Sequence, residues 1–480
     1  ASAPPHQVGA ERYPESTMAR FSRHPASAPP VAPERERTRH LLLRGWMVFS
    51  LFFAFTAPGW VLGFGVPLTA IVGGVIVAGS AVMVAVIRPP FQWRRLPWIA
   101  GTFILWAGLS IAWSGWRETS ALTWLLLVAT TFQGIAIASV LTWREIVRAI
   151  GAALGWVIGL SLAAEILVAW LVGGPRDAGC EMEAAAGDAE WISGGIFAGA
   201  RIDGVIGNPN LLGMIALLSV IVFAIEFAAR ESRRIMLGVW IGLSALTLVL
   251  AASVTAWIAT AGVALVLATV LLMRTARRPG ERTRYYVGYA LIGAAGAVAL
   301  WIWRVPVFTA LDRTADLLDR ETIWTAVLER AGDHLAIGGG FATPWLPWDP
   351  AFQDWIVLDG SQVTQAHSVW VDILFQLGVV GVFLLGFAYL AFVWRSWFFA
   401  VDRPRWDLRA DRPYSALTLL PTLTAAVLLV QGLAETAPLM GWGWMLMILL
   451  GSKIKQSPHI GEGPAEQRLA IERGELLRAN

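Results

Sequence analysis

Histidine is rare in this sequence, and position separates one histidine from the rest. The 480 residues contain six, and four of them fall in the terminal segments 1–44 and 453–480. Of the other two, His334 and His367, the second stands where a long polar segment meets a hydrophobic run. An imidazole changes its protonation near neutral pH and can act as a general base. His367 is therefore the first candidate for a group that performs chemistry.

Two glycines follow His367 at spacings that match its face of a helix. Gly378 lies 11 residues and Gly381 lies 14 residues after it, and at about 100° per residue both return to within roughly 40° of the histidine's direction. A small surface on that face would let another helix or a lipid chain approach closely. An ordinary helix-packing stripe beneath a surface histidine would show the same pattern, so both interpretations stay open.

A second candidate site lies around two of the three asparagines of the chain, Asn208 and Asn210. Asn208 before Pro209 is typical of an N-cap followed by proline at the first helical position. The start of a helix presents N–H groups and a partial positive charge, which can bind a phosphate. The alternative is simply a well-capped transmembrane helix. Ser368 could cap a second helix that begins on the same side.

Arginines accompany both candidate sites. Arg201 precedes the two asparagines, and Arg304 and Arg320 lie in the segment before His367. The planar guanidinium group donates two parallel hydrogen bonds to a phosphate and keeps its charge. Arg320 also has a local explanation, because Asp316 lies four residues earlier in the favourable acid-then-base order on a helix. Two helix starts together with these arginines would form a compact anion site.

The composition of the chain sets its class. Hydrophobic residues make up 56% and charged residues 15% of the sequence, which indicates a polytopic membrane protein rather than a soluble domain. The single cysteine, Cys180, excludes an intramolecular disulfide framework and a cysteine-built metal site. The net charge of +3 gives no strongly basic surface, so the composition does not favour nucleic acid as a partner.

The hydrophobic runs predict an all-α protein with about twelve transmembrane helices, each long enough for a hydrocarbon layer of about 30 Å. We expect the spans near 45–64, 66–87, 96–113, 121–141, 149–172, 207–228, 235–252, 254–273, 285–303, 368–394, 413–434 and 437–452. Residues 251–255 read Ala-Ala-Ser-Val-Thr, which favours a tight hairpin over one long span.

The positive charges predict the orientation. With both termini in the cytoplasm, the inner segments hold 30 of the 37 lysines and arginines and the outer segments hold 7, as the positive-inside rule expects. The layout is then a disordered tail at 1–44 rather than a signal peptide, a transmembrane domain at 45–452 and a second tail at 453–480. Two outer loops are large, 173–206 and 304–367, and loops of this length suggest a site on the outer face.

Each of the two outer loops has a distinct pattern. The first carries an acidic run, Asp177, Glu181, Glu183, Asp188 and Glu190, which we interpret as a solvated surface rather than a metal site. The second contains an amphipathic helix near 311–335, with Ile323, Val327, Leu328 and Leu335 among its apolar positions. This helix is expected to break at the three glycines 338–340.

Three motifs together resemble the bacterial O-antigen ligase superfamily. His367-Ser368, nine residues, Gly378, two residues and Gly381 fit its motif H-[NSQ]-x9-G-x2-[GTY]. The stretch from Arg201 to Asn208-Pro209-Asn210 is similar to its Arg-to-NPN segment. Arg320-x-x-x-Trp324 followed by Gly338-Gly339-Gly340-Phe341 is similar to its last outer loop.

One position departs from the family. The family carries an arginine at the outer turn between spans seven and eight, where this chain has Val254. One phosphate contact is thereby missing, and Arg201 or Arg304 would have to replace it.

The resemblance implies a GT-C-like membrane glycosyltransferase. It would transfer a saccharide from undecaprenyl pyrophosphate to the hydroxyl of a glycan or lipid acceptor at the extracytoplasmic face of the bacterial inner membrane, with inversion and without metal or cofactor. Arg320 and Arg201 would stabilise the leaving pyrophosphate, while Asn208, Asn210, Ser368 and Arg304 would help to bind it. His367 would either deprotonate the acceptor or orient a phosphate.

Other functions remain possible on sequence alone. A polymerase of the same superfamily would use the same chemistry on a different acceptor, and a non-catalytic scaffold would use the loops as docking surfaces. A flippase of lipid-linked saccharides would be expected to carry ionisable residues near the bilayer midplane. Here Glu165, Glu226 and Asp372 lie toward the ends of spans, which favours chemistry at the membrane surface over transport.

Overall fold

The computed structural model of the chain describes residues 34–89, 92–172, 191–229, 234–276, 281–310, 314–358, 361–402, 414–439, 441–458 and 460. The helices are α1 (Glu34–Ile87), α2 (Trp98–Leu109), α3 (Arg117–Val140), α4 (Trp143–Val172), α5 (Pro209–Ala228), α6 (Arg234–Ala251), α7 (Val254–Thr275), α8 (Glu281–Ala310), α9 (Thr314–Ala331), α10 (Val369–Val401), α11 (Leu420–Ala434) and α12 (Trp442–Gln456). Two short strands, β1 (Val357–Leu358) and β2 (Ser361–Gln362), pair antiparallel.

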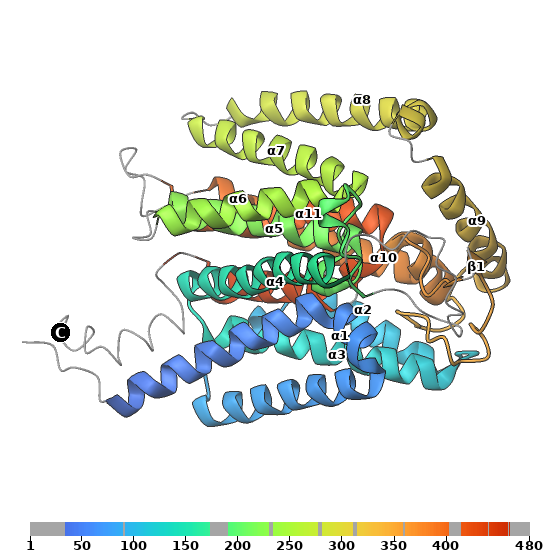
Figure 1. Ribbon diagram of the computed structural model, residues 1–480, viewed down its shortest axis with the longest axis horizontal. Coiled ribbons are helices and arrows are strands. Elements are labelled where there is room, and N and C mark those ends of the chain that lie inside the picture. Colours follow the sequence, from blue (N-terminus) through green and yellow to red (C-terminus); the bar gives the residue numbers. More distant parts are fainter. Residues whose placement is uncertain are drawn as a thin grey trace, which may run out of the picture.

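Most of the helices lie side by side along the long axis of the molecule (Figure 1). Nine of the described helices are long and apolar enough to cross a membrane. The protein is therefore an all-α polytopic membrane protein, as the composition predicted. The strongly apolar sequence forms helices because a membrane offers no water to backbone groups, which must then bond within each segment.

The difference between nine helices and twelve predicted spans has structural causes. α1 contains two limbs, because Gly65 has φ 80° and ψ 162° and breaks the helix, and Trp46 of one limb donates to Ser80 of the other at 2.9 Å. The apolar helix Trp98–Ala112 is shorter than the nine, and so is α12 with 15 residues. With these included, each predicted span corresponds to a helix or to one limb of α1.

Two further predictions concern chain boundaries. α6 ends at Ala251 and α7 begins at Val254, with Ala252 at φ 47°, so the predicted hairpin at 251–255 is confirmed. α1 begins at Glu34, and residues 34–44, which we assigned to a disordered tail, are helical. Residues 1–33 and 461–480 lie outside the described residues, and so does the acidic run of the first predicted outer loop.

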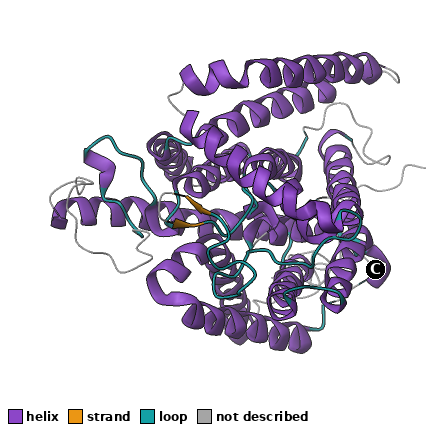
Figure 2. Cartoon of the chain, turned by 90° about the vertical axis from the view of Figure 1, so that its right-hand side faces the viewer, coloured by secondary structure: helices purple, strands orange, loops and turns teal. Residues whose placement is uncertain are grey.

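We name the two ends of the bundle by the segments that they carry. The loop end holds α9, the β1–β2 hairpin, residues 332–368 and Glu435, and Figure 2 faces it. The tail end holds the first residues of α1, the start of α4 and the last residues of α12.

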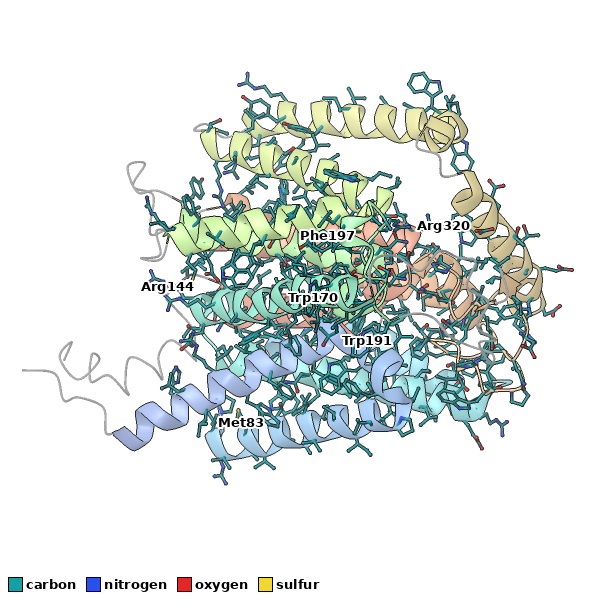
Figure 3. The ribbon with its side chains drawn as sticks, viewed as in Figure 1. Met83, Arg144, Trp170, Trp191, Phe197 and Arg320 are labelled. Atoms are coloured by element: carbon teal, nitrogen blue, oxygen red, sulfur yellow. The ribbon has the colours of Figure 1, made fainter. Side chains whose placement is uncertain are left out.

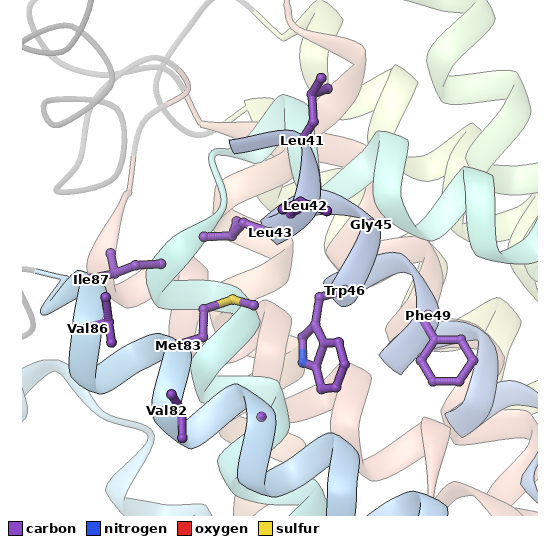
Figure 4. A pocket seen from close by; sticks show the side chains of 11 residues that line it. Leu41, Leu42, Leu43, Gly45, Trp46, Phe49, Val82, Met83, Val86 and Ile87 are labelled. Atoms are coloured by element: carbon purple, nitrogen blue, oxygen red, sulfur yellow. The ribbon is translucent and has the colours of Figure 1, made fainter. Parts of the chain in front are cut away.

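An apolar cavity of about 600 Å³ lies between the limbs of α1 near the tail end, with Trp46 and Met83 among its lining (Figure 4). None of the residues that line it is titratable, so it suits lipid chains rather than a polar substrate.

The loop end has a small hydrophobic core of its own. Ile323 and Val327 of α9 are buried there with Trp116, Trp345 and Phe352. Two other apolar positions of the predicted amphipathic helix, Leu328 and Leu335, are exposed, so the buried stripe of α9 is narrower than the spacing suggested. This core fixes α9 and the loop that follows it against the bundle.

The glycine segment, residues 335–340, docks onto a break in α10. Gly378 has φ 66° and ψ −169°, and the chain there exchanges backbone bonds with the segment, including Val379 N to Leu335 O at 2.9 Å and Gly340 N to Gln376 O at 2.8 Å. A Cβ atom on Gly378 would overlap the backbone of Ala336. Only glycine combines this positive φ with so close an approach.

Two tryptophans just before α3 bond to the other side of the glycine segment. The indole N–H of Trp113 donates to Gly338 O at 3.2 Å, and that of Trp116 donates to Gly340 O at 3.0 Å. The backbone of the glycine segment is thus hydrogen-bonded on both sides. These bonds attach the glycine segment to α10 and to the residues before α3. From this segment the chain continues toward His367.

Candidate active site

The carboxylate of Glu435 is the point at which the candidate residues meet. Glu435 follows α11, and its side chain is 2% exposed. One oxygen, Oε2, lies 3.1 Å from His367 Nδ1 and 3.4 Å from Gln365 Nε2. The other, Oε1, lies 3.4 Å from Asn210 Nδ2 and 3.8 Å from Arg320 Nη2. Four side chains from three distant parts of the sequence therefore converge on one buried charge.

His367 is presented by a strained turn just before α10. Its φ is 49°, a left-handed conformation that is uncommon for residues with side chains. The preceding carbonyl, of Ala366, accepts a hydrogen bond from Trp324 Nε1 at 2.9 Å, which helps to hold the turn. The imidazole is 30% exposed, so it can reach both the buried carboxylate and a substrate.

The contact with Glu435 also selects the tautomer of His367. A carboxylate accepts hydrogen bonds only, so Nδ1 carries the proton and Nε2 keeps its lone pair. Among the described residues, Nε2 makes no hydrogen bond. An imidazole held in this way can accept a proton from a hydroxyl that approaches Nε2.

Arg320 reaches the site from α9 and lies at the loop end in Figure 3. Its side chain is 17% exposed, and its distance of 3.8 Å from Glu435 makes an ion pair without a hydrogen bond. Within the described part of the chain its guanidinium donates no hydrogen bond, so its donors are available to a ligand. The side chain of Asp316, its alternative partner, lies outside the described residues.

Arg330, ten residues later on α9, differs from Arg320 because neighbouring residues occupy its guanidinium group. Its Nη1 donates to Ala351 O at 2.9 Å, and its guanidinium lies over four aromatic rings, nearest that of Trp355 at 4.5 Å. Burial lowers the pKa of Arg330, and the nearby carboxylates of Asp333 and Asp349 oppose the shift. Arg330 holds the loop-end core together, whereas Arg320 is left free to bind.

Arg201 joins the site through Asn210. Its Nη2 donates to Asn210 Oδ1 at 2.8 Å, and its Nε donates to Ala251 O at 3.2 Å. Ala251 lies at the turn just before Val254, where the resembling family carries an arginine. Arg201 therefore brings a guanidinium group to the place where the sequence lacks one.

Asn208 caps α5, as its position before Pro209 predicted. Its Oδ1 accepts from the backbone N–H groups of Asn210 and Leu211 at 2.9 and 3.0 Å, and Leu212 N bonds to Asn208 O. Proline has no N–H group, so the first donors of this helix are all engaged or absent. The structure thus favours the structural alternative for Asn208 over a phosphate site at the helix start.

Ser368 and the two glycines differ from the expectation. Ser368 is at the N-cap position of α10, but its side chain makes no capping hydrogen bond. Gly378 packs against the glycine segment rather than against a helix or a lipid. Gly381 is buried, close to Leu377 and Ile373 of its own helix. The break at Gly378 explains why the two glycines do not share one face of α10 with His367, because the regular helical repeat does not continue through Gly378.

Arg304 was the remaining residue predicted to bind the pyrophosphate. It belongs to α8, but the position of its side chain lies outside what the structure describes. Its role in binding stays a prediction.

Glu435 is the residue that the sequence reasoning missed. Glu435-Thr436 is the polar interruption between two apolar runs that end at 434 and resume at 437, on the same side as the other candidates. A carboxylate at that position was the available signal. Its importance emerges only from contacts with residues 68 to 225 positions away in the chain.

The fold and this site define an all-α polytopic membrane protein with an imidazole, a carboxylate and guanidinium groups at one end of the bundle. A family model described as O-antigen ligase matches residues 237–386. Over these residues the match supports the resemblance to the O-antigen ligase superfamily. It includes Arg320 and His367, while Arg201 and Glu435 lie outside it. No curated protein matches the chain.

The family match bears on the class of function only. The match supports a glycosyltransferase of the O-antigen ligase or polymerase type, and such a family implies a lipid-linked glycan substrate and association with a membrane.

Proposed function

We propose that this protein transfers a saccharide from undecaprenyl pyrophosphate to a hydroxyl of a glycan or lipid acceptor, with the loop end on the extracytoplasmic face. The observation that carries the proposal is the contact of His367 Nδ1 with the buried Glu435 carboxylate at 3.1 Å, beside Arg320 at 3.8 Å. Base, orienting carboxylate and cation lie together, which is what transfer from a pyrophosphate donor needs.

His367 acts as the general base in this scheme. The acceptor oxygen attacks the anomeric carbon of the donor sugar, and its proton passes to Nε2 of His367. The bond between the anomeric carbon and the pyrophosphate oxygen breaks on the opposite face, so the configuration inverts. Glu435 holds the imidazole in the required tautomer and stabilises the imidazolium that forms.

The arginines stabilise the leaving group. Charge grows on the pyrophosphate as the glycosidic bond breaks, and fixed cations placed beside it lower the energy of the transition state. Arg320 has uncommitted donors for the terminal phosphate, and Arg201 adds charge from behind Asn210. In this scheme guanidinium groups neutralise the pyrophosphate, so we propose a metal-independent transfer.

Transport is less well supported by the contacts of the buried carboxylates. Glu165 Oε1 accepts from the backbone N–H groups of Asp203 and Gly204 at 3.0 and 2.9 Å, so it shapes the turn before α5. A polymerase would share the proposed chemistry, with a second lipid-linked glycan as acceptor. The contacts of the described residues favour neither acceptor over the other.

Reconstitution tests the proposal. The purified protein in proteoliposomes is supplied with an undecaprenyl-pyrophosphate oligosaccharide and a panel of glycan and lipid acceptors, in the presence of EDTA. Mass spectrometry is expected to find a new glycosidic bond with no ion gradient applied. Movement of the donor across the bilayer without any new bond would replace transfer by transport.

The single cysteine offers a test of orientation. Cys180 falls in the predicted outer loop 173–206. A maleimide that does not cross membranes is expected to label it in spheroplasts. Labelling only after the membrane is opened would place the loop end on the cytoplasmic side and contradict the proposed topology.

A further inference from the structure

Asp372 is a buried carboxylate that has no role in the proposed chemistry. It lies in the first turn of α10 and is 1% exposed. Its Oδ2 accepts from Thr436 Oγ1 at 2.7 Å and from Ala366 N at 3.4 Å, and its Oδ1 accepts from Gln376 Nε2 at 2.9 Å. Burying a charge is costly unless it is hydrogen-bonded, and here donors from three segments surround it.

Two of these partners are chain neighbours of the catalytic pair. Ala366 immediately precedes His367, and Thr436 immediately follows Glu435. Asp372 therefore ties the turn that presents the imidazole to the corner that presents the carboxylate. A second bond, from Thr436 N to Gln365 Oε1 at 3.3 Å, joins the same two segments.

The third partner, Gln376, links Asp372 to the glycine segment. Its Oε1 accepts from Ala342 N at 2.9 Å and from Thr343 Oγ1 at 2.8 Å. These two donors fix the orientation of the amide, so Nε2 must face Asp372. The network thus extends to the loop that leads from α9, the helix that carries Arg320.

A carboxylate suits this position because it only accepts hydrogen bonds. An amide in its place would set an N–H donor against the N–H group of Ala366 or of Gln376, neither of which can accept. Gln376 cannot turn over without facing Ala342 N with its own N–H group. The geometry therefore requires an acceptor on both arms of residue 372.

We infer that Asp372 and Thr436 are positioning residues, which hold the His367 turn and the Glu435 corner in register so that the imidazole keeps its tautomer and direction. This inference rests on the proposed transfer reaction. Neither residue touches the substrate in this scheme. Asp372 acts through its bonds to Ala366 and Thr436, and Thr436 acts through its chain neighbour Glu435. Small displacements of a reacting group have large effects on rate, on the order of 100-fold for about 1 Å.

The test removes one hydroxyl and keeps the shape of the side chain. Thr436→Val deletes the bond to Asp372, and Thr436→Ser keeps it. The matched control is Thr424→Val on α11, because Thr424 is also fully buried and its Oγ1 has no hydrogen-bond partner among the described residues. The donor KM and kcat of transfer are measured in proteoliposomes for all three variants and the parent.

Thr436→Val is expected to lower kcat by about 10- to 100-fold with the donor KM within about twofold of the parent. Thr436→Ser is expected to restore most of kcat, and Thr424→Val to match the parent. Asp372→Asn, with nearly unchanged volume, is a second route to the same loss. A merely structural role would lower the yield of folded protein without this selective loss of kcat.

The outcomes separate the two proposals. A parent protein that makes no glycosidic bond contradicts the proposed function itself. An active parent with equally active Thr436→Val and Asp372→Asn overturns the positioning role alone, and so does loss of folded protein in both variants with normal kcat per folded molecule. A selective loss of kcat that serine restores supports it.

Discussion

The two ends of the bundle each hold a contact between a histidine and a buried glutamate. At the tail end, His40 Nε2 lies 2.8 Å from Glu145 Oε1. At the loop end, His367 Nδ1 lies 3.1 Å from Glu435 Oε2. The pairs are similar in distance and in the burial of the carboxylate, so the difference between them must come from their surroundings.

At the tail end, the remaining capacity of the carboxylate is used to start a helix. Glu145 Oε2 accepts from Thr142 N at 3.0 Å and from Thr142 Oγ1 at 2.9 Å. This Thr-x-x-Glu arrangement at the first turn of α4 is a capping box. His40 therefore adds one more contact to a carboxylate that already has a structural task.

At the loop end, the corresponding carboxylate caps no helix. The other contacts of Glu435 are side chains at 3.4 to 3.8 Å, and one of them, Arg320, has donors to spare. A histidine beside a glutamate is thus not a site in itself. A cation with free donors and a histidine in a strained left-handed turn distinguish the pair at the loop end.

The largest expected effect separates the two histidines. His367→Ala removes the proposed base, and general-base catalysis contributes about 10²- to 10⁴-fold, so transfer is expected to fall below detection. His40→Ala is the control and is expected to keep the parent rate per folded molecule. The measurement is product formation in proteoliposomes. Equal activity of the two variants would abolish the distinction between the ends.

The carboxylates provide the second test. Glu435→Gln keeps the shape but removes the charge that stabilises the imidazolium, and we expect kcat to fall by about 100-fold or more. Glu145→Gln is expected to have little effect, because glutamine also completes a capping box. Both rates are measured at saturating donor. If Glu145→Gln lowered kcat as much as Glu435→Gln, the tail-end pair would belong to the mechanism.

The arginines give a smaller effect that appears in binding. Arg320→Lys loses the planar fork, and about one charge-assisted hydrogen bond, or ~1.5 kcal/mol, corresponds to a donor KM about tenfold higher. At the tail end, Arg274 is committed to Ala400 O at 2.9 Å and Thr418 Oγ1 at 2.8 Å. Arg274→Lys should therefore leave the donor KM unchanged. An unchanged KM in Arg320→Lys would restore the Asp316 pair as the role of Arg320.

The helices and their breaks could be predicted because they are local. Gly65 and the turn at Ala252-Ser253 interrupt apolar runs in the sequence, and the structure breaks at both places. The meeting of His367 and Arg320 followed from a shared side of the membrane and a family motif. These inferences needed only spacing, composition and the side on which each loop emerges.

The contacts that define the site could not be predicted in the same way. Glu435 meets His367 because α10 and α11 pack side by side, and no periodicity in the sequence reports which helices become neighbours. Gly378 misled the helical projection, because a projection assumes the regular backbone that this glycine interrupts. Asp372 was visible as a charge near a span end, but its partners lie in three separate segments.

The smallest expected effect concerns the two helix starts. Thr142 completes the capping box at the tail end, and Thr142→Ala is expected to lower the free energy of unfolding by about 1 kcal/mol without changing transfer. Ser368 occupies the N-cap of α10 but makes no capping bond, so Ser368→Ala is expected to change stability by less than about 0.5 kcal/mol. Thermal unfolding in detergent measures both. If Ser368→Ala were the more destabilising change, the polar groups at the start of α10 would serve stability as those at the tail end do. The contrast between a stabilising and a reactive histidine–glutamate pair would then lose one of its supports.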